Sequence, residues 1–282
     1  MQKRGWMIIK NIKKLVDSKP IAASLLLLVL WYGINTLLSV LEIAVPFFEE
    51  TEIGKLCMII LSYYVVPFFL AALFGHLWIY RGGSFFKTIN AGQYVLYYGI
   101  AIAYLFISKS LNMTFKSPLG IVSAIVYIIG IGFHEETIFR GLVANFIGKK
   151  YMKDLKGFYF SIAMTSVLFG LIHLVNMTRG VQLLSAVVQS LVAISLGAVF
   201  TAIYYRGGNL WALMFLHSVI DLGPLFQTLF TVNEGGAAGA INTLGIMNLI
   251  PIIPNVIALV WIMRKSKAQE ALVHMRKRYE TL

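Results

Sequence analysis

Cysteine and charged residues are scarce in this 282-residue sequence. The only cysteine is Cys57, so the chain can form no internal disulfide and no metal site made of thiolates. Charged residues make up 13% of the chain, about half of the roughly 25% found in soluble domains. Too few charges are present to cover the surface of a soluble protein of this size. We therefore expect a membrane protein.

Acidic residues are fewer than basic ones, 12 against 24, which gives a formal net charge of +12. The basic residues lie in short segments between apolar blocks and at both chain ends. No polar segment shows a basic stripe with interleaved aromatic residues, which is the pattern expected of a nucleic-acid surface. We therefore predict membrane lipid, and not nucleic acid, as the partner of these charges.

Long apolar runs dominate what remains, since 59% of the residues are hydrophobic. A membrane-spanning helix needs about 20 mostly apolar residues. Eight blocks meet or approach this length: 20–41, 56–80, 92–108, 119–147, 158–178, 181–204, 209–230 and 240–263. The predicted fold is an all-α, polytopic bundle of about eight transmembrane helices. We divide it into three N-terminal spans (1–118), a core (119–230) and a last span with a basic tail (231–282).

The charges of the connecting segments predict the orientation of this bundle. Lys and Arg concentrate at both ends and after every second apolar block. The opposite side carries few basic residues and holds most of the glutamates outside the spans: Glu42, Glu49, Glu50, Glu52 and Glu234. Because cytoplasmic segments are enriched in Lys and Arg, we expect both termini in the cytoplasm.

The sequence HEETIFRG, residues 134–141, places ionisable groups at the end of an apolar run. Charged groups at bilayer depth are costly and usually face a bundle interior or a water-filled cavity. Glu136 and Arg140 are spaced i, i+4, which suits an ion pair on one helix face. Glu135 is rotated by about 100° from Glu136. We predict that Glu136 pairs with Arg140, whereas Glu135 points into a cavity and acts as a general base.

Two later blocks also carry polar side chains. His173 follows Phe169 by one helical turn, and His217 and Asp221 are spaced i, i+4. At a rise of about 1.5 Å per residue, Glu135, His173 and Asp221 lie roughly 20 Å from the cytoplasmic helix ends and His217 roughly 13 Å. Each group alone also suits a structural core position, but together they indicate one buried site.

These residue types allow some hydrolytic mechanisms and exclude others. The zinc pattern H-E-x-x-H begins at His134 but meets Ile138 where the second histidine is needed. No G-x-S-x-G motif is present, and one intramembrane aspartate cannot form an aspartic dyad. Glu135 with His173 can activate a water, while His217 donates to an oxyanion and Asp221 orients it or lines the same cavity. Alternatively, two histidines and a carboxylate can hold a metal.

Three motifs in these blocks resemble a known family, the CAAX protease and bacteriocin-processing (CPBP, or Abi) intramembrane proteases. The motif E-E-x-x-x-R stands as EETIFR, residues 135–140, and F-x-x-x-H as FGLIH, residues 169–173. The motif H-x-x-x-N or D stands as HSVID, residues 217–221, after the similar lead-in RGGNLWALMFLH. The resemblance covers about 120 to 225.

The resemblance implies an all-α membrane endopeptidase in which Glu135 and His173 activate water and His217 and Asp221 stand where the oxyanion is stabilised. Members of this family remove the last residues of prenylated proteins in eukaryotes, and in prokaryotes they are linked to bacteriocin immunity and peptide maturation. Asp221 departs from the Asn of the prenyl-protein proteases. An ionised carboxylate cannot donate a hydrogen bond, which favours an orienting role for Asp221.

We therefore predict a multi-pass endopeptidase of a prokaryotic cell membrane that cleaves a hydrophobic, prenylated or otherwise lipid-tethered peptide. Glu136, Arg140 and Phe169 support the site. No cofactor is required by the metal-free glutamate mechanism, whereas a divalent metal such as zinc would be held by Glu135, His173 and His217. The alternatives are a non-catalytic immunity or scaffold protein of the same fold and a transporter, for which helix-breaking residues give little support.

Overall fold

The computed structural model describes residues 11–232, 239 and 241–281. The residues up to Lys10 and Glu234, which contribute to the predicted orientation, lie outside these ranges. The described residues form helices and no strand, apart from an isolated bridge between Phe115 and Thr231. The all-α prediction is therefore confirmed, while the cytoplasmic location of the termini stays a prediction.

Six helical segments are long and apolar enough to cross a membrane: Pro20–Ala44, Glu52–Leu73, Pro118–Tyr151, Leu155–Arg179, Leu183–Gly207 and Leu210–Phe230. They correspond to six of the eight predicted blocks. The other two blocks occur as helix pairs, Phe85–Ala91 with Gln93–Lys109 and Ile246–Ile262 with Lys265–Glu280, bent by 71° and 72°. The described part of the chain thus has six to eight candidate spans, as expected for a multi-pass integral membrane protein.

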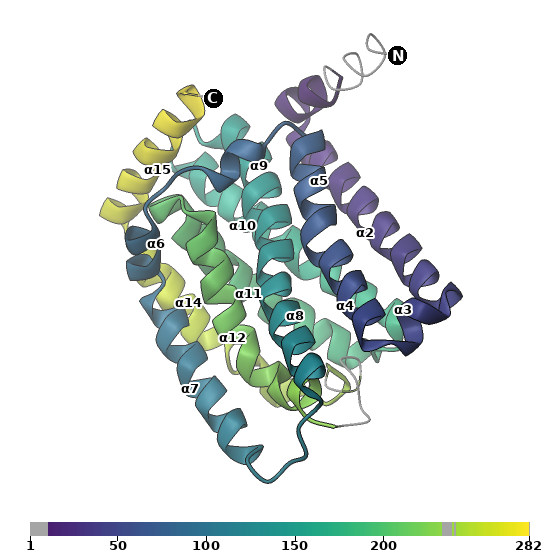
Figure 1. The fold of residues 1–282 in the computed structure, drawn as a ribbon. Helices are drawn as coiled ribbons and strands as arrows, with labels where there is room; N and C mark the ends of the chain where they lie inside the picture. Colours follow the sequence, from purple (N-terminus) through teal and green to yellow (C-terminus); the bar gives the residue numbers. More distant parts are fainter. Residues whose placement is uncertain (1–10, 233–238, 240, 282) are drawn as a thin grey trace.

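Four helices form the middle of the bundle: α8 (Pro118–Glu136), α10 (Leu155–Ile172), α11 (Leu183–Gly207) and α12 (Leu210–Phe230). On one side lie α2 (Pro20–Ala44), α3 (Pro46–Glu50), α4 (Glu52–Ile60) and α5 (Val66–Leu73), with a π-helical turn, η1 (Leu61–Val65), between the last two. Figure 1 shows α7 (Gln93–Lys109) and α14 (Ile252–Ile262) on the other side. The helix α15 (Lys265–Glu280) lies at the same end of the bundle as the start of α2.

The outer helices turn apolar side chains outward, as a lipid-facing surface requires. Large exposed hydrophobic residues occur along α2 and α14, among them Leu37, Ile43, Ile257 and Val260. Short polar side chains begin the core helices by accepting hydrogen bonds from free backbone N–H groups. Ser117, Asp154 and Asn209 accept from Gly120, Gly157 and Ala212 at 2.8–2.9 Å. These caps define where the three site-bearing helices start.

The helix that carries the glutamate pair changes its winding directly after Glu136. Residues Thr137–Val143 form a π-helical segment, η3, before the chain resumes as α9 (Ala144–Tyr151). The Ala144 N–H reaches back to the Phe139 carbonyl, five residues earlier. Asn145, which is 1% exposed, donates its side-chain amide to the carbonyls of Arg140 and Gly141 at 3.0 and 2.8 Å. Such π segments are frequent at functional sites.

Candidate active site

Glu136 and Arg140 form a fully buried ion pair at the start of the π segment. Arg140 Nη1 donates to Glu136 Oε1 at 2.8 Å, and both side chains are 0% exposed. Arg140 Nη2 donates to the Gly197 carbonyl at 3.2 Å. The guanidinium also lies over the ring of Phe169, 4.5 Å from its centroid. The expected i, i+4 pair is present, and it is enclosed by aromatic and backbone groups of α10 and α11.

His217 of α12 connects this ion pair to the cavity side of the site. Its Nδ1 donates to Glu136 Oε1 at 2.6 Å, so the carboxylate determines which ring nitrogen carries this hydrogen. Its Nε2 lies 3.6 Å from Glu135 Oε2 and 3.4 Å from Asp221 Oδ2. One imidazole is therefore surrounded by three carboxylates from two helices, α8 and α12.

A glycine makes this approach of α8 and α12 possible. A Cβ on Gly132 would lie 2.5 Å from the Met214 carbonyl oxygen and 2.8 Å from Ser218 Oγ. Gly132 is one turn before Glu136, and Met214 and Ser218 flank His217. Any larger residue at 132 would push the two helices apart at the level where Glu136 meets His217.

His173 and Phe169 come from the end of α10. His173 begins a short 3-10 helix, η4 (His173–Arg179), and its Nδ1 donates to the Phe169 carbonyl at 2.8 Å. In the neutral imidazole this leaves Nε2 as the acceptor. The Phe169 ring lies edge-on to both histidines, with centroid distances of 5.0 Å to His173 and 6.4 Å to His217. Phe169 thus packs between the two imidazoles and the buried guanidinium.

The predicted site residues share one cavity of about 560 Å³ among the membrane helices, which we call the central cavity. Its wall includes Glu135, His173, His217, Asp221 and Phe169, together with many apolar side chains. Glu135 and Asp221 are 23% and 26% exposed, whereas His217 is 5% exposed. The two carboxylates therefore reach the cavity, and the imidazole lies behind them. A general base and a donor beside one space suit the hydrolysis of a carbonyl compound.

A zinc site in a protein needs at least three converging side-chain ligands. Within the described residues, no three His, Cys, Asp or Glu side chains are arranged to hold a metal ion. His217 Nδ1 is occupied by Glu136, and Nε2 lies at hydrogen-bonding or ion-pairing range from two carboxylates. These residues as positioned do not fit a three-ligand zinc site.

Several contacts could not be read from the sequence. The hydrogen bond from His217 to Glu136 joins residues 81 positions apart, and no local spacing indicates it. The sequence favours Asp221 as a residue that orients His217; its Oδ2 lies 3.4 Å from Nε2, and Glu136 holds Nδ1 in addition. His134, which begins the incomplete zinc pattern, accepts a hydrogen bond from Trp31 Nε1 and also lines the central cavity. The Gly197 carbonyl and the Phe200 ring beside Arg140 carried no sequence signal.

Comparison with known families gives one result that bears on this geometry. Residues 117–223 match the family model described as type II CAAX prenyl endopeptidase Rce1-like. No curated protein and no solved structure matched the chain in the parallel comparisons. The matched segment contains α8, α10, α11 and all four residues predicted to act on the substrate. Residues 117–223 are thus similar to the CPBP/CAAX protease family, as the three motifs indicated.

Proposed function

We propose that this chain is an intramembrane endopeptidase that hydrolyses a peptide bond in a hydrophobic or lipid-tethered peptide with Glu135 as general base. The observation that carries the proposal is that Glu135 Oε2 and Asp221 Oδ2 lie 3.6 and 3.4 Å from His217 Nε2, on the wall of a cavity between membrane helices. The predominantly apolar lining of that cavity suits a substrate that enters from the bilayer. A prokaryotic cell membrane is the proposed location.

The proposed reaction begins with a water in the central cavity. Glu135 takes a proton from this water, and the water oxygen attacks the carbonyl carbon of the scissile peptide bond. His173, whose Nδ1 is committed to the Phe169 carbonyl, offers Nε2 as an acceptor that orients the water. The C–N bond then breaks, and the leaving nitrogen takes the proton held by Glu135. The products are a carboxylate and an amine, and the enzyme returns to its initial state.

His217 has a separate proposed role in this reaction. When both ring nitrogens carry hydrogens, Nδ1 donates to Glu136 and Nε2 presents a donor beside Glu135 and Asp221. This donor stabilises the oxyanion that forms on the former carbonyl oxygen. Arg140 holds Glu136 from the other side, so the imidazole cannot rotate without breaking a buried hydrogen bond. Asp221 carries part of the charge balance of the imidazolium.

Purified protein in proteoliposomes tests the proposal, with quenched fluorescent reporters built on a hydrophobic peptide with and without a prenyl group. The wild type should cleave at least one reporter. Glu135→Gln keeps the side-chain shape but removes the base, and it should lower the rate by about 10²–10⁴-fold. Glu49→Gln, at an exposed position on α3, is the matched control and should retain the wild-type rate. Equal rates for Glu135→Gln and the wild type would refute the assignment and favour a protein that acts by binding.

A further inference from the structure

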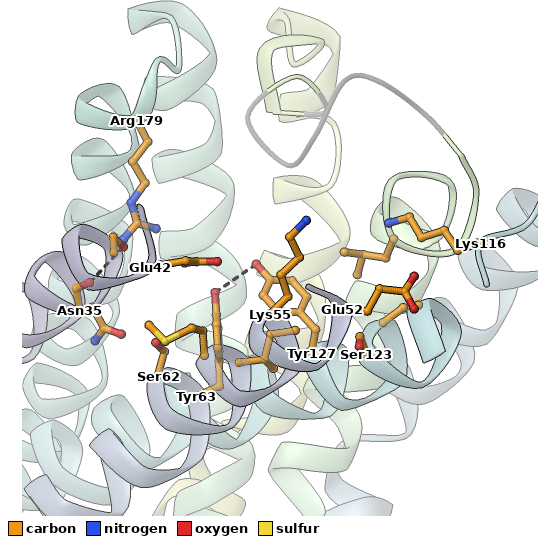
Figure 2. Close-up of a pocket in the computed structure, with 16 residues that line it drawn as sticks. Asn35, Glu42, Glu52, Lys55, Ser62, Tyr63, Lys116, Ser123, Tyr127 and Arg179 are labelled. Atoms are coloured by element: carbon orange, nitrogen blue, oxygen red, sulfur yellow. Dashed lines mark hydrogen bonds between the residues drawn. The ribbon is translucent and has the colours of Figure 1, made fainter. Parts of the chain in front are cut away.

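A second cavity of about 730 Å³ lies beside the first, and it differs from it in chemistry. It is bounded by α2, α4, η1 and the first half of α8, with Lys116, Arg179 and Leu229 contributed by neighbouring segments. Five charged residues line it: Glu42, Glu52, Lys55, Lys116 and Arg179. Figure 2 shows these side chains around the opening. We call this cavity the charged pocket.

The charges of this pocket are available to a ligand. Glu52 accepts a hydrogen bond from Ser117 at 2.6 Å, and Lys116 donates to the Thr228 carbonyl at 3.2 Å. Within the part of the chain that the structure describes, none of the five charges is in an ion pair. Burial and the nearby charge of Lys55 lower the pKa of Lys116. Three cations against two carboxylates in a recessed space favour a bound anion.

The charged pocket and the central cavity share part of their walls. Asn35, Tyr63, Tyr127 and Arg179 line both. The hydroxyl groups of Tyr63 and Tyr127 meet at this boundary, where Tyr63 donates to Tyr127 at 3.1 Å, drawn as a dashed line in Figure 2. The two cavities are therefore adjacent, with these side chains at their common boundary.

One face of α8 borders both cavities. Ser123 and Tyr127 line the charged pocket, and Tyr127, Ile131 and Glu135 line the central cavity. These residues recur every four positions, so they lie on the same side of the helix. From Tyr127 to Glu135 the distance along the axis is about 12 Å, which an extended peptide covers with about four residues. A peptide whose scissile bond lies at Glu135 would thus reach the charged pocket about four residues away.

Arg179 is the cation that such a peptide end would meet first. It is the only Lys or Arg among the described residues that line the central cavity, and it also lines the charged pocket. It ends the same short helix, η4, that His173 begins. Figure 2 shows its side chain extending from that helix into the pocket, toward the side where Asn35 and Glu42 lie. A guanidinium binds a carboxylate with two parallel hydrogen bonds.

We propose that the charged pocket is a specificity subsite that binds a carboxylate of the peptide about four residues from the scissile bond, through Arg179, with Lys55 as a second cation on the wall of the same pocket. This inference rests on the proposed peptidase function and names the chemistry of the part of the substrate that lies outside the apolar cavity. The carboxylate comes either from the free C-terminus of the peptide or from an acidic side chain near its end.

Peptide binding to Glu135→Gln protein tests the subsite without requiring cleavage. Three labelled peptides share one apolar segment and differ at the end: a free C-terminal carboxylate, a C-terminal amide, and an amide with an aspartate as the last residue. We expect at least one of the two acidic peptides to bind about tenfold more tightly than the neutral amide, as a charge-assisted hydrogen bond provides. Adding Arg179→Gln should reduce this preference to less than twofold, and the unchanged binding of the neutral amide shows that the protein is folded.

Lys109→Gln, at an exposed cation that lines neither cavity, is the matched control and should keep the full preference. The peptide that loses affinity in Arg179→Gln identifies the source of the carboxylate. Three results would overturn the subsite. They are a preference for acidic peptides that persists in Arg179→Gln, no such preference in the protein that keeps Arg179, and no binding of any peptide. Cleavage of the same peptides by the wild type tests the peptidase proposal separately. A binding preference that depends on Arg179, found without cleavage, would contradict the peptidase proposal but not the subsite.

Discussion

His217 Nδ1 lies 2.6 Å from Glu136 Oε1, and this contact joins α12 to α8 in the middle of the bundle. The same carboxylate oxygen accepts from Arg140 at 2.8 Å. The first glutamate of the pair, Glu135, reaches the central cavity, while the second holds the histidine and the arginine behind it. Two adjacent glutamates of one helix thus occupy different environments because a helix turns by about 100° per residue.

Replacing Glu136 should affect stability as well as activity. Glu136→Gln removes the charge that compensates buried Arg140, and breaking such a pair costs about 3–5 kcal/mol. Thermal unfolding of the purified protein should show a clear loss, whereas Glu135→Gln should unfold near the wild-type temperature. Glu270→Gln, in the exposed pair with Lys267, provides the control. Equal unfolding temperatures for Glu136→Gln and Glu135→Gln would contradict the assigned difference between the two glutamates.

The close approach at Gly132 is needed for the site and not only for packing. Gly132→Ala places a methyl group against the Met214 carbonyl, so α8 and α12 must separate near Glu136 and His217. We expect reporter cleavage to fall by about tenfold or more, since small displacements of reacting groups are costly. Gly33→Ala on α2 has nothing within 4 Å of the added methyl and should cleave normally. Wild-type cleavage by Gly132→Ala would show that the helices need not be this close.

Asn145 should stabilise the π segment that carries Arg140. Its amide satisfies the Arg140 and Gly141 carbonyls, and its Oδ1 accepts from Tyr279 of α15 at 3.2 Å. Asn145→Ala leaves these buried groups without this partner, and we expect a loss of about 1–3 kcal/mol in unfolding free energy. Tyr279→Phe removes one hydrogen bond only and should cost about 1 kcal/mol. Denaturant unfolding measures both, and equal losses would contradict the role of Asn145.

Metal removal tests the donor geometry of the central cavity. No three side chains among the described residues are arranged to hold a metal, so the proposed mechanism uses Glu135 and His217 directly. We expect cleavage by the purified protein to continue after dialysis against a strong chelator. Zinc added back afterwards should not raise the rate. Loss of cleavage on dialysis and its recovery with zinc would instead support the metal alternative with Glu135, His173 and His217.

The sequence predicted the helical class better than the contacts between helices. Apolar length alone located six of the spans, because each must cross the same hydrocarbon thickness. The bend beside Gly92 could not be predicted from apolar length alone. The i, i+4 spacing of Glu136 and Arg140 predicted their pairing because both residues lie on one helix.

Contacts between helices could not be predicted from the sequence, and the reason is physical. Spacing within one helix says nothing about which face of another helix packs against it, so the bond between Glu136 and His217 could not be predicted. The same holds for Arg179, whose place on the walls of both cavities depends on how η4 packs against α2, α10 and α11. In the sequence, Arg179 is recognisable only as a basic residue between two apolar blocks.

Mass spectrometry of reporter products formed in water labelled with heavy oxygen is the most direct measurement of whether Glu135 drives hydrolysis. Wild-type protein and Glu135→Gln are compared in proteoliposomes with the same hydrophobic peptide. We expect the wild type to yield two fragments, with one heavy oxygen in the new carboxylate, and Glu135→Gln to leave the peptide intact. Labelled fragments from Glu135→Gln at the wild-type rate, or an intact peptide with both proteins, would contradict the proposed hydrolysis.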